Sequence, residues 1–266
     1  LTPDADVTGV VAAQTNTIQA SYVAESGATL VEFATGAPQL LKGEVTENVG
    51  TRVDSHSLRQ PLGVVAGILP WNFPFFLIAR KMAPALITGN TTVIKPSEET
   101  PNNCFEFAKL VAETDLPNGV FNVVCGSGAG VGSALTTSSG IDMISFTGST
   151  RAGIAITKAA ADTVKKVALE LGGKGANLVF ADADPKAVER GARHCFNNSG
   201  QSCNAPTRML VERSVYDRAV ETAARVAGET QVATAHQPGR HIGPVVSRRQ
   251  WERIQDLIQT GIARLR

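Results

Sequence analysis

The chain has 266 residues, of which 43% are hydrophobic and 18% are charged, and its formal net charge is +1. This composition is typical of a globular protein that can bury one large core or two cores of ordinary size. A charge so close to zero, with no block of basic residues, argues against nucleic acid or an anionic membrane surface as a partner.

The four cysteines and four histidines show no metal-ligand pattern. No Cys-x-x-Cys pair is present and the histidines are not spaced as zinc ligands, so we predict no metal site. Free thiols favour a reducing compartment, and the first residues lack the charged start and apolar core of an export signal. We therefore expect a cytoplasmic protein. Three of the thiols, those of Cys104, Cys125 and Cys195, are expected to be small core residues.

An uncharged stretch at residues 60–79 is long enough to be tested as a membrane span. It contains Pro61, Pro70 and Pro74, however, which a single lipid-exposed helix tolerates poorly. We expect instead a buried strand that runs into a functional loop.

Hydrophobic periodicity divides the chain into a helical start and a longer alternating part. From about Thr17 to Leu41, apolar residues recur at helical spacing and predict one or two surface helices. Beyond residue 60, short apolar runs predict strands at Gly63–Leu69, Thr91–Lys95, Gly119–Val124, Met143–Thr147, Val164–Leu169, Asn177–Phe180 and Arg208–Glu212. Amphipathic stretches predict helices at Leu77–Ile87, Cys104–Thr114, Val131–Thr137, Arg151–Ala161, Pro185–Asn198, Val215–Gly228 and Arg248–Ile262.

Strands and helices in turn, joined by short connections, are typical of an α/β fold with a mostly parallel sheet covered on both faces. Such sheets bind ligands beyond the carboxyl ends of their strands. The loops that follow the predicted strands should therefore gather along one edge. Glycines at Gly172–Gly175 would let the chain turn there into a second sheet, which indicates a domain boundary.

Two loops are candidates for binding a dinucleotide. Cys125–Gly132 follows a strand and opens a helix, but its alternating glycines do not meet the Gly-x-Gly-x-x-Gly spacing. Phe146–Thr150 ends a strand and starts a helix with small hydroxyl residues, whose backbone N–H groups suit a pyrophosphate. For either loop, an ordinary capped helix after a strand is the alternative interpretation.

A third loop, Lys95–Glu98, points to an adenosine. Pro96 stops the strand and directs Lys95 and Glu98 into the loop. A glutamate after the second strand suits hydrogen bonds to both ribose hydroxyls. It would repel a ribose 2′-phosphate by roughly 4 kcal/mol for unit charges 4 Å apart at an effective dielectric of 20. This favours NAD over NADP, while a solvated turn remains the alternative.

Three further side chains suggest covalent chemistry on a carbonyl. Cys203 lies among polar loop-forming residues, unlike a core cysteine. Because an ordinary thiol is mostly protonated at neutral pH, it needs a base. Glu170 is the candidate, acting through water, although a surface carboxylate at a strand end is the alternative. Asn72, between two prolines, could donate its amide to an oxyanion.

These residues resemble the aldehyde dehydrogenase superfamily. Five segments match that family in its order: Gly67–Pro74, Lys95–Glu98, Phe146–Thr150, Leu169–Lys174 and Ser199–Cys203. The resemblance implies a Rossmann-like coenzyme domain, a catalytic α/β domain and an oligomerising β-extension. It places the coenzyme domain with its N-terminal helices at residues 1–172 and a partial catalytic domain at residues 173–266. It also implies NAD(P)-dependent oxidation of an aldehyde to a carboxylate, with NAD favoured.

The resemblance also implies roles for the catalytic residues. Cys203 would be the nucleophile that forms a thiohemiacetal and then a thioester. Asn72 and the Cys203 backbone N–H would hold the oxyanion. Glu170 would activate the deacylating water, and Lys81 would support its proton relay.

By the same resemblance, Lys95 and Glu98 would hold the adenosine ribose, and Ser149 would lie near the pyrophosphate. The positions that match the coenzyme pocket are Leu69, Pro70, Trp71, Lys95, Ser97, Glu98, Gly128, Phe146, Thr147, Gly148, Ser149 and Leu171.

Substrate selection is assigned to Arg80 and Asn197. Arg80 lies where the family lines its substrate entrance, and the stretch Leu62–Val111 is most similar to lactaldehyde and succinate-semialdehyde dehydrogenases. Many semialdehyde enzymes carry an arginine where this chain has Asn197. A short hydroxyaldehyde such as lactaldehyde or glycolaldehyde, or another uncharged polar aldehyde, is therefore favoured over a semialdehyde.

The chain is roughly half the family's usual length, so we expect either a piece of a longer polypeptide or a truncated protein. The full-length form would be a homodimer or homotetramer. Two alternatives belong to other classes: a non-catalytic NAD-binding or assembly subunit, and a thiol hydrolase that uses Cys203 and Glu170 without coenzyme. The adenosine and pyrophosphate motifs argue against the hydrolase.

Overall fold

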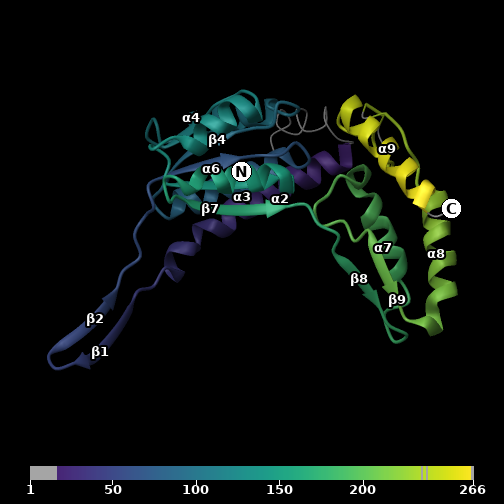
Figure 1. The fold of residues 1–266 in the computed structure, drawn as a ribbon, viewed down its shortest axis with the longest axis horizontal. Helices are drawn as coiled ribbons and strands as arrows, with labels where there is room; N and C mark the ends of the chain where they lie inside the picture. The colour runs from purple at the N-terminus through teal and green to yellow at the C-terminus, as the bar shows by residue number, and fades with distance from the viewer. Residues whose placement is uncertain (1–16, 235, 238, 265–266) are drawn as a thin grey trace. The chain divides into compact units, whose positions relative to one another are not determined.

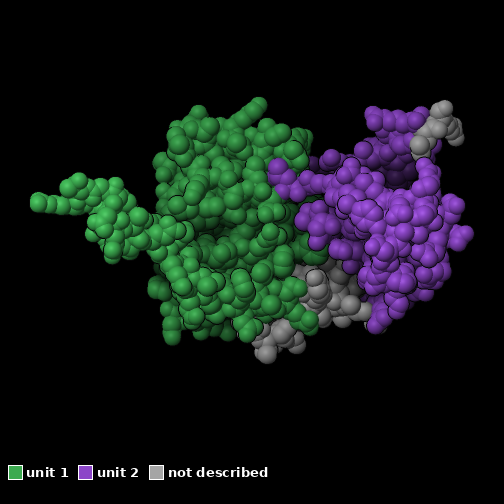
Figure 2. All heavy atoms as spheres, turned by 90° about the horizontal axis from the view of Figure 1, so that it is seen from below, with its two compact units in different colours: residues 1–7, 23–170 green, residues 8–22, 171–266 purple. Residues whose placement is uncertain are grey.

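The computed structural model describes residues 17–234, 236, 237 and 239–264, with side chains from Glu25 onward. These residues divide into two compact units after Glu170 (Figure 2). The first unit holds residues 23–170, and the second holds residues 17–22 and 171–264. Each unit has a parallel sheet of its own.

The sheet of the first unit has five strands in the order β5-β4-β3-β6-β7. Strand β3 pairs in parallel with β4 and with β6, and β4 pairs in parallel with β5. The chain therefore adds strands on one side of β3 and then, from β6, on the other. The bounds are β3 (Val64–Ile68), β4 (Thr91–Lys95), β5 (Phe121–Val123), β6 (Met143–Gly148) and β7 (Lys166–Leu171). The predicted α/β fold is confirmed.

Helices connect these strands (Figure 1). Helix α3 packs on β3, β4 and α4, whereas α5 packs on α6, which contacts β6. Because right-handed crossovers run to opposite sides of β3, the two helix pairs lie on opposite faces of the sheet. The bounds are α3 (Pro74–Ile87), α4 (Asn102–Ala112), the π-helical turn η2 (Gly128–Gly132), α5 (Ser133–Thr137) and α6 (Thr150–Ala161).

The core of this unit lies between the sheet and its helices. Ala66, Ile94 and Ile144, one from each of three adjacent strands, are fully buried. On the α3 and α4 face, the Phe107 ring packs edge-on against Phe75 and Phe121 at centroid distances of 5.5 and 5.6 Å. These contacts hold the sheet and helices in the arrangement that places the loops.

A β-hairpin precedes the sheet and was not among the predicted strands. After α2 (Thr17–Thr35) and η1 (Ala37–Leu40), strands β1 (Glu44–Gly50) and β2 (Val53–Ser57) pair antiparallel and project from the unit's sheet (Figure 1). Every residue of both strands is exposed. With no buried face, the hairpin has no need of the apolar alternation by which strands are recognised.

The second unit is built around two strands. β8 (Ala176–Val179) pairs in parallel with β9 (Arg208–Val211), and α7 (Ala187–Phe196) connects them and packs on α8. Ala192, Ala219 and Val226 are buried between these elements. The remaining elements are η3 (Asn197–Gly200), η4 (Arg213–Val215), α8 (Tyr216–Glu229) and α9 (Arg248–Arg264).

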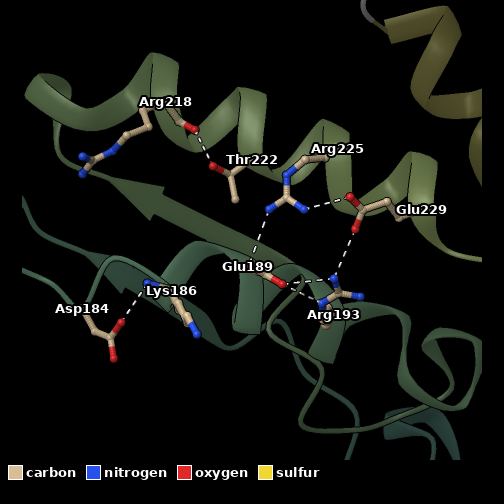
Figure 3. A network of polar contacts seen from close by, with 8 residues as sticks. All are labelled: Asp184, Lys186, Glu189, Arg193, Arg218, Thr222, Arg225 and Glu229. Atoms are coloured by element: carbon tan, nitrogen blue, oxygen red, sulfur yellow. Dashed lines mark hydrogen bonds and ion pairs between the residues drawn. The ribbon is translucent and has the colours of Figure 1, made fainter. Parts of the chain in front are cut away.

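A network of four ion pairs lies on α7 and α8, of which two, Arg193–Glu229 and Arg225–Glu189, join one helix to the other (Figure 3). Arg193 lies 3.0 Å from Glu189 and 3.2 Å from Glu229, and Arg225 lies 3.4 Å from Glu189 and 2.9 Å from Glu229. The four side chains are partly solvent-exposed and their two positive and two negative charges balance. We therefore interpret the network as a structural contact between the two helices.

The structure also bears on the membrane span and the metal ligands considered in the sequence analysis, for the residues that it describes. Within them, no helix is long and apolar enough to cross a bilayer, and the uncharged stretch at residues 60–79 forms β3, a loop and part of α3. No group of metal-ligating side chains occurs among the same residues.

Candidate active site

The loops after β3, β4, β5 and β6 lie at one edge of the sheet, because these strands are parallel. The order of the strands reverses between β3 and β6, which are neighbours. In open α/β sheets such a reversal leaves a crevice where ligands bind. The candidate site of the first unit is therefore centred on the loops after β3 and β6.

The loop after β3 holds the candidate oxyanion donor. The backbone N–H of Leu69 donates to the carbonyl of Lys95 at 3.0 Å, which ties the start of this loop to β4. Pro70, Trp71 and Asn72 follow and are half-buried. Pro74 then opens α3, where its missing N–H costs nothing. Asn72 is thus held between a strand end and a helix start.

Helix α3 carries Lys81 into the interior. Its side chain is only 6% exposed, and its Nζ donates to Ser145 Oγ on β6 at 2.9 Å. The pKa of Lys81 is lowered to about 8: burial is the largest cause, the positive charge of Arg80 also lowers it, and the negative charge of Glu170 opposes both. A lysine with this pKa can exchange a proton near neutral pH.

The preceding residue reaches the candidate base. Arg80 Nη2 lies 3.2 Å from Glu170 Oε1, an ion pair between α3 and the edge strand β7. Both side chains are about half exposed, which leaves them open to a ligand. Arg80 and Lys81, assigned from the family resemblance, therefore form one cluster with Glu170.

On the other side of β3, the predicted ribose ligands contact the glycine-rich turn. Lys95 is 2% exposed, and its Nζ donates to the carbonyls of Pro96 at 2.7 Å and Gly126 at 2.8 Å. Glu98 Oε2 lies 3.6 Å from the same nitrogen, while its Oε1 accepts the Gly128 N–H at 2.6 Å. Ser97, between them, is buried.

The charge of Glu98 is favoured by these contacts. Partial burial raises its pKa, but hydrogen bonds from its own N–H and that of Gly128, together with the Lys95 charge, lower it more, so the net pKa is below the usual value. Gly128 itself is open, since an added Cβ would have no heavy atom within 4 Å. The turn thus keeps a free face beside an ionised carboxylate.

The start of α6 is the candidate pyrophosphate site. Ser149 caps the helix, accepting the Ala152 N–H at 3.3 Å, and is itself exposed. A Cβ at Gly148 would lie 2.5 Å from the Phe146 ring, so a larger residue here would require that ring to shift. Thr147 is 8% exposed, and its Oγ1 makes no hydrogen bond to the described residues. A capped helix start next to the strand reversal is a favourable anion site.

The candidate nucleophile lies in the second unit, in the loop that follows η3. Cys203 is exposed. Upstream of it, Asn198, Ser199 and Gly200 have φ of 51°, 56° and 74°, a left-handed run that costs energy at the two residues with a Cβ. Asn197 is exposed at the start of η3, and Leu171 is half-buried at the end of β7.

Sequence reasoning missed the residue that holds this loop. Gln201 Nε2 donates to the Asn198 carbonyl at 3.0 Å, and its Oε1 accepts the Val246 N–H at 2.8 Å. The Ser199 hydroxyl donates to the Gly243 carbonyl. The only sequence signal was the presence of Gln201 inside the Ser199–Cys203 motif, because its partner Val246 lies 45 residues away.

One expectation about the other thiols is wrong. Cys104 is buried, and burial raises its pKa to about 12, whereas Cys195 is half-buried with its Sγ 3.0 Å from the Pro206 carbonyl oxygen. Cys125, however, is exposed. It comes after the end of β5, where the chain has left the sheet.

A comparison with protein families identifies the chain. The sequence model of the aldehyde dehydrogenase family matches residues 10–265. The chain belongs to this family.

Two curated relatives are similar over most of this chain. A 3-succinoylsemialdehyde-pyridine dehydrogenase from a Pseudomonas species is 44% identical over 92% of this chain and 51% of its own length. The lactaldehyde dehydrogenase of Escherichia coli is also 44% identical, over 83% of this chain and 47% of its own length. The chain thus spans about half the length of the curated relatives it matches.

Solved aldehyde dehydrogenases share the fold. The enzyme from Bartonella henselae superposes with a TM-score of 0.89 at 46% identity, over 98% of this chain and 56% of that one. Lactaldehyde dehydrogenase from Escherichia coli gives 0.91 at 38% identity, over 94% and 54%. A betaine aldehyde dehydrogenase from Staphylococcus aureus, solved with NAD+, gives 0.93 at 29% identity, over 97% and 53%.

Proposed function

We propose that this chain carries the coenzyme-binding part and the nucleophile of an enzyme that oxidises a small polar aldehyde to its carboxylate with NAD. The observation that carries the proposal is the Arg80–Lys81–Glu170 cluster, with Arg80 and Lys81 on α3 and Glu170 on the edge strand β7. In this proposal residues 1–172 form the coenzyme-binding domain and residues 173–266 form part of the catalytic domain.

The residues present fit a dinucleotide. The capped start of α6, with the unpartnered Thr147 Oγ1 beside it, offers donors for a pyrophosphate. Lys95 and Glu98 are positioned against the open Gly128 turn and would hold the adenosine ribose. When bound, NAD supplies the oxidant for the aldehyde. Further contacts are proposed for Leu69, Pro70, Trp71, Ser97, Phe146, Gly148, Ser149 and Leu171.

Residues of the chain itself would carry out the remaining steps of the reaction. The Cys203 sulfur adds to the aldehyde carbon, forming a thiohemiacetal and, after oxidation, a thioester. The amide of Asn72 and the Cys203 backbone N–H donate to the carbonyl oxygen as it gains charge, an effect commonly worth a hundredfold or more in rate. Glu170 takes a proton from the water that cleaves the thioester. Lys81 receives that proton when its amine is neutral.

The proposed substrate is a short hydroxyaldehyde, of the lactaldehyde or glycolaldehyde type. Arg80 is half exposed next to Glu170 and can donate to a hydroxyl or carboxylate on the aldehyde. Asn197 is exposed and uncharged in the loop before Cys203, so a semialdehyde carboxylate would have one cation fewer to bind. The similarity to a lactaldehyde dehydrogenase supports this choice.

For the environment of the protein we propose a cytoplasmic homodimer or homotetramer. The fully exposed β1–β2 hairpin, with Val45, Val49 and Val53 more than half exposed, supports an assembly contact. Unpaired hairpins of this kind are rarely stable alone in water.

The decisive experiment uses protein expressed from its complete reading frame. Cys203→Ala should abolish aldehyde-dependent NADH formation at 340 nm while NAD binding by calorimetry persists. Cys125→Ala, which removes another exposed thiol, is the matched control and should retain turnover. Substantial turnover in the Cys203 variant would overturn the proposal. NAD binding without aldehyde oxidation in the unmodified protein would favour the non-catalytic subunit.

A further inference from the structure

On the face of the sheet that α3 covers, β3 has a glycine at position 67 next to Ser145 of β6. Gly67 and Ser145 are register partners on these strands, so positions 67 and 145 share one face. A Cβ at Gly67 would lie 2.5 Å from Ile94 Cδ1, 3.5 Å from Lys81 Cδ and 3.6 Å from Lys81 Cβ. The aliphatic stem of Lys81 therefore passes close to Gly67, beside the Ile94 side chain, and its amine reaches Ser145.

The Ser145 hydroxyl completes this arrangement. Lys81 Nζ donates to Ser145 Oγ at 2.9 Å in an environment where the lysine is 6% exposed. An ammonium needs an acceptor when it is withdrawn from water, and a hydroxyl provides one. A hydroxyl can also donate to the neutral amine after rotating its proton. Ser145 therefore suits both protonation states of Lys81.

Two charged groups on neighbouring elements act on the same amine. Arg80, from α3 itself, disfavours its protonation, and Glu170, from β7, favours it. Because these two are ion-paired with each other, their effects on Lys81 partly cancel. The uncharged Ser145 hydroxyl is then the partner that sets the position of the Lys81 amine and contributes to its pKa.

We propose that Ser145 is a positioning residue for Lys81: its hydroxyl holds the buried amine over Gly67, ready to exchange a proton with the Glu170 side of the site. The inference rests on the proposed function. When Glu170 has taken a proton from water, the neutral Lys81 amine accepts it and becomes an ammonium, which returns it to solvent. Without the hydroxyl, the amine loses its acceptor and its fixed location.

The test is the pH profile of three variants of the protein expressed from its complete reading frame. Ser145→Ala should lower kcat about tenfold at neutral pH, the effect of one lost hydrogen bond to a charged group. It should also move the limb of the profile assigned to Lys81 to lower pH by about one unit, because the ammonium loses its acceptor. Ser145→Thr restores the hydroxyl, so it should restore kcat and return the Lys81 limb of the profile to its original pH.

Thr92→Val is the matched control. Thr92 is a 1%-exposed residue of β4, in the same sheet, and its Oγ1 makes no hydrogen bond to the described residues. Its replacement should leave the profile unchanged. A Ser145→Ala profile that coincides with the unmodified one, or a threonine variant no better than alanine, would overturn the proposal.

An NMR titration of protein labelled with ¹³C at the lysine ε-carbons separates this proposal from the proposed function. Lys81→Met identifies the Lys81 signal. The titration midpoint of that signal should fall in Ser145→Ala and stay in Thr92→Val, whether or not the protein oxidises aldehydes. An unmoved midpoint refutes the role of Ser145, whereas an active Cys203→Ala variant refutes the proposed function alone.

Discussion

Arg80 Nη2 and Glu170 Oε1 lie 3.2 Å apart, so the candidate substrate-binding side chain is ion-paired with the candidate base. Because the two side chains are 47% and 58% exposed, the pair adds little to folding stability. Its consequence is functional. Under the proposed function, an aldehyde whose hydroxyl binds Arg80 would compete for the guanidinium and leave the Glu170 carboxylate available to a water molecule.

Replacing Arg80 should therefore separate polar from apolar substrates. Arg80→Met is expected to raise KM for lactaldehyde by about ten- to hundredfold, the range for a lost hydrogen bond to a charged group. The KM for propanal, which offers the guanidinium no partner, should change much less. Arg80→Lys keeps the charge without the planar fork and should give an intermediate KM. Equal losses for both aldehydes would contradict a role in substrate selection.

Lys81 links the site to stability. Folding lowers its pKa from 10.5 to about 8, so the unfolded chain binds more protons between these pH values and stability should rise with pH across that interval. Below about pH 8 the folded protein bears the full cost of the buried charge, about 3 kcal/mol for this shift.

Lys81→Met should remove that cost. Urea unfolding is expected to show a variant at least as stable as the unmodified protein at pH 7, with no rise between pH 8 and 10.5. Lys158→Met, which replaces an exposed lysine on α6, is the control and should keep the rise. A Lys81 variant that is strongly destabilised at pH 7 would mean that the ammonium is better solvated than its burial indicates.

Glu98 should set the preference for NAD. Its carboxylate is held against the glycine-rich turn by the Gly128 N–H at 2.6 Å and the Lys95 ammonium at 3.6 Å, so it cannot easily turn away from a 2′-phosphate. Glu98→Gln keeps an acceptor for Gly128 but removes the charge. We expect kcat/KM with NADP to rise about tenfold or more, since a close like-charge contact costs a few kcal/mol, while NAD turnover falls.

Steady-state kinetics with both coenzymes check this expectation, and Glu99→Gln provides a control because Glu99 is the exposed carboxylate next in sequence. A Glu98→Gln variant with an unchanged NADP to NAD ratio would remove the residue from coenzyme selection.

The sequence predicted those parts of the molecule where local pattern and burial agree. Strand β4 was predicted to the residue, because its five positions are mostly buried and end at a proline that stops pairing. The loops at the strand ends followed from the alternation of strands and helices. By contrast, the β1–β2 hairpin left no apolar pattern because all of it is exposed.

Contacts between residues far apart in the chain could not be predicted from the sequence. Arg80 and Glu170 are separated by ninety positions, and Lys81 and Ser145 by sixty-four, so no local spacing connects them. Glu170 was predicted from its own motif, whereas the neighbours Arg80 and Lys81 were assigned from the family resemblance. Their grouping depends on α3 side chains that reach Ser145 on β6 and Glu170 on β7, which only the sheet topology determines.

Gln201 provides the last prediction, because it holds a strained loop. Asn198 and Ser199 occupy left-handed backbone conformations, which persist only where surrounding contacts over-determine them. The Gln201 side chain supplies two of these contacts, to the Asn198 carbonyl and the Val246 N–H. Its loss should let the loop relax and shift Cys203, the proposed nucleophile.

Gln201→Ala is expected to lower kcat by about a hundredfold, the cost of a roughly 1 Å misplacement of reacting groups, with the NAD dissociation constant unchanged. Gln201→Glu retains the acceptor for Val246 but loses the donor to Asn198. Its kcat should lie between those of the unmodified protein and Gln201→Ala. Gln259→Ala, at an exposed position on α9, should behave as the unmodified protein. If Gln201→Ala instead weakened NAD binding and left kcat intact, the residue would serve coenzyme binding and not the nucleophile loop.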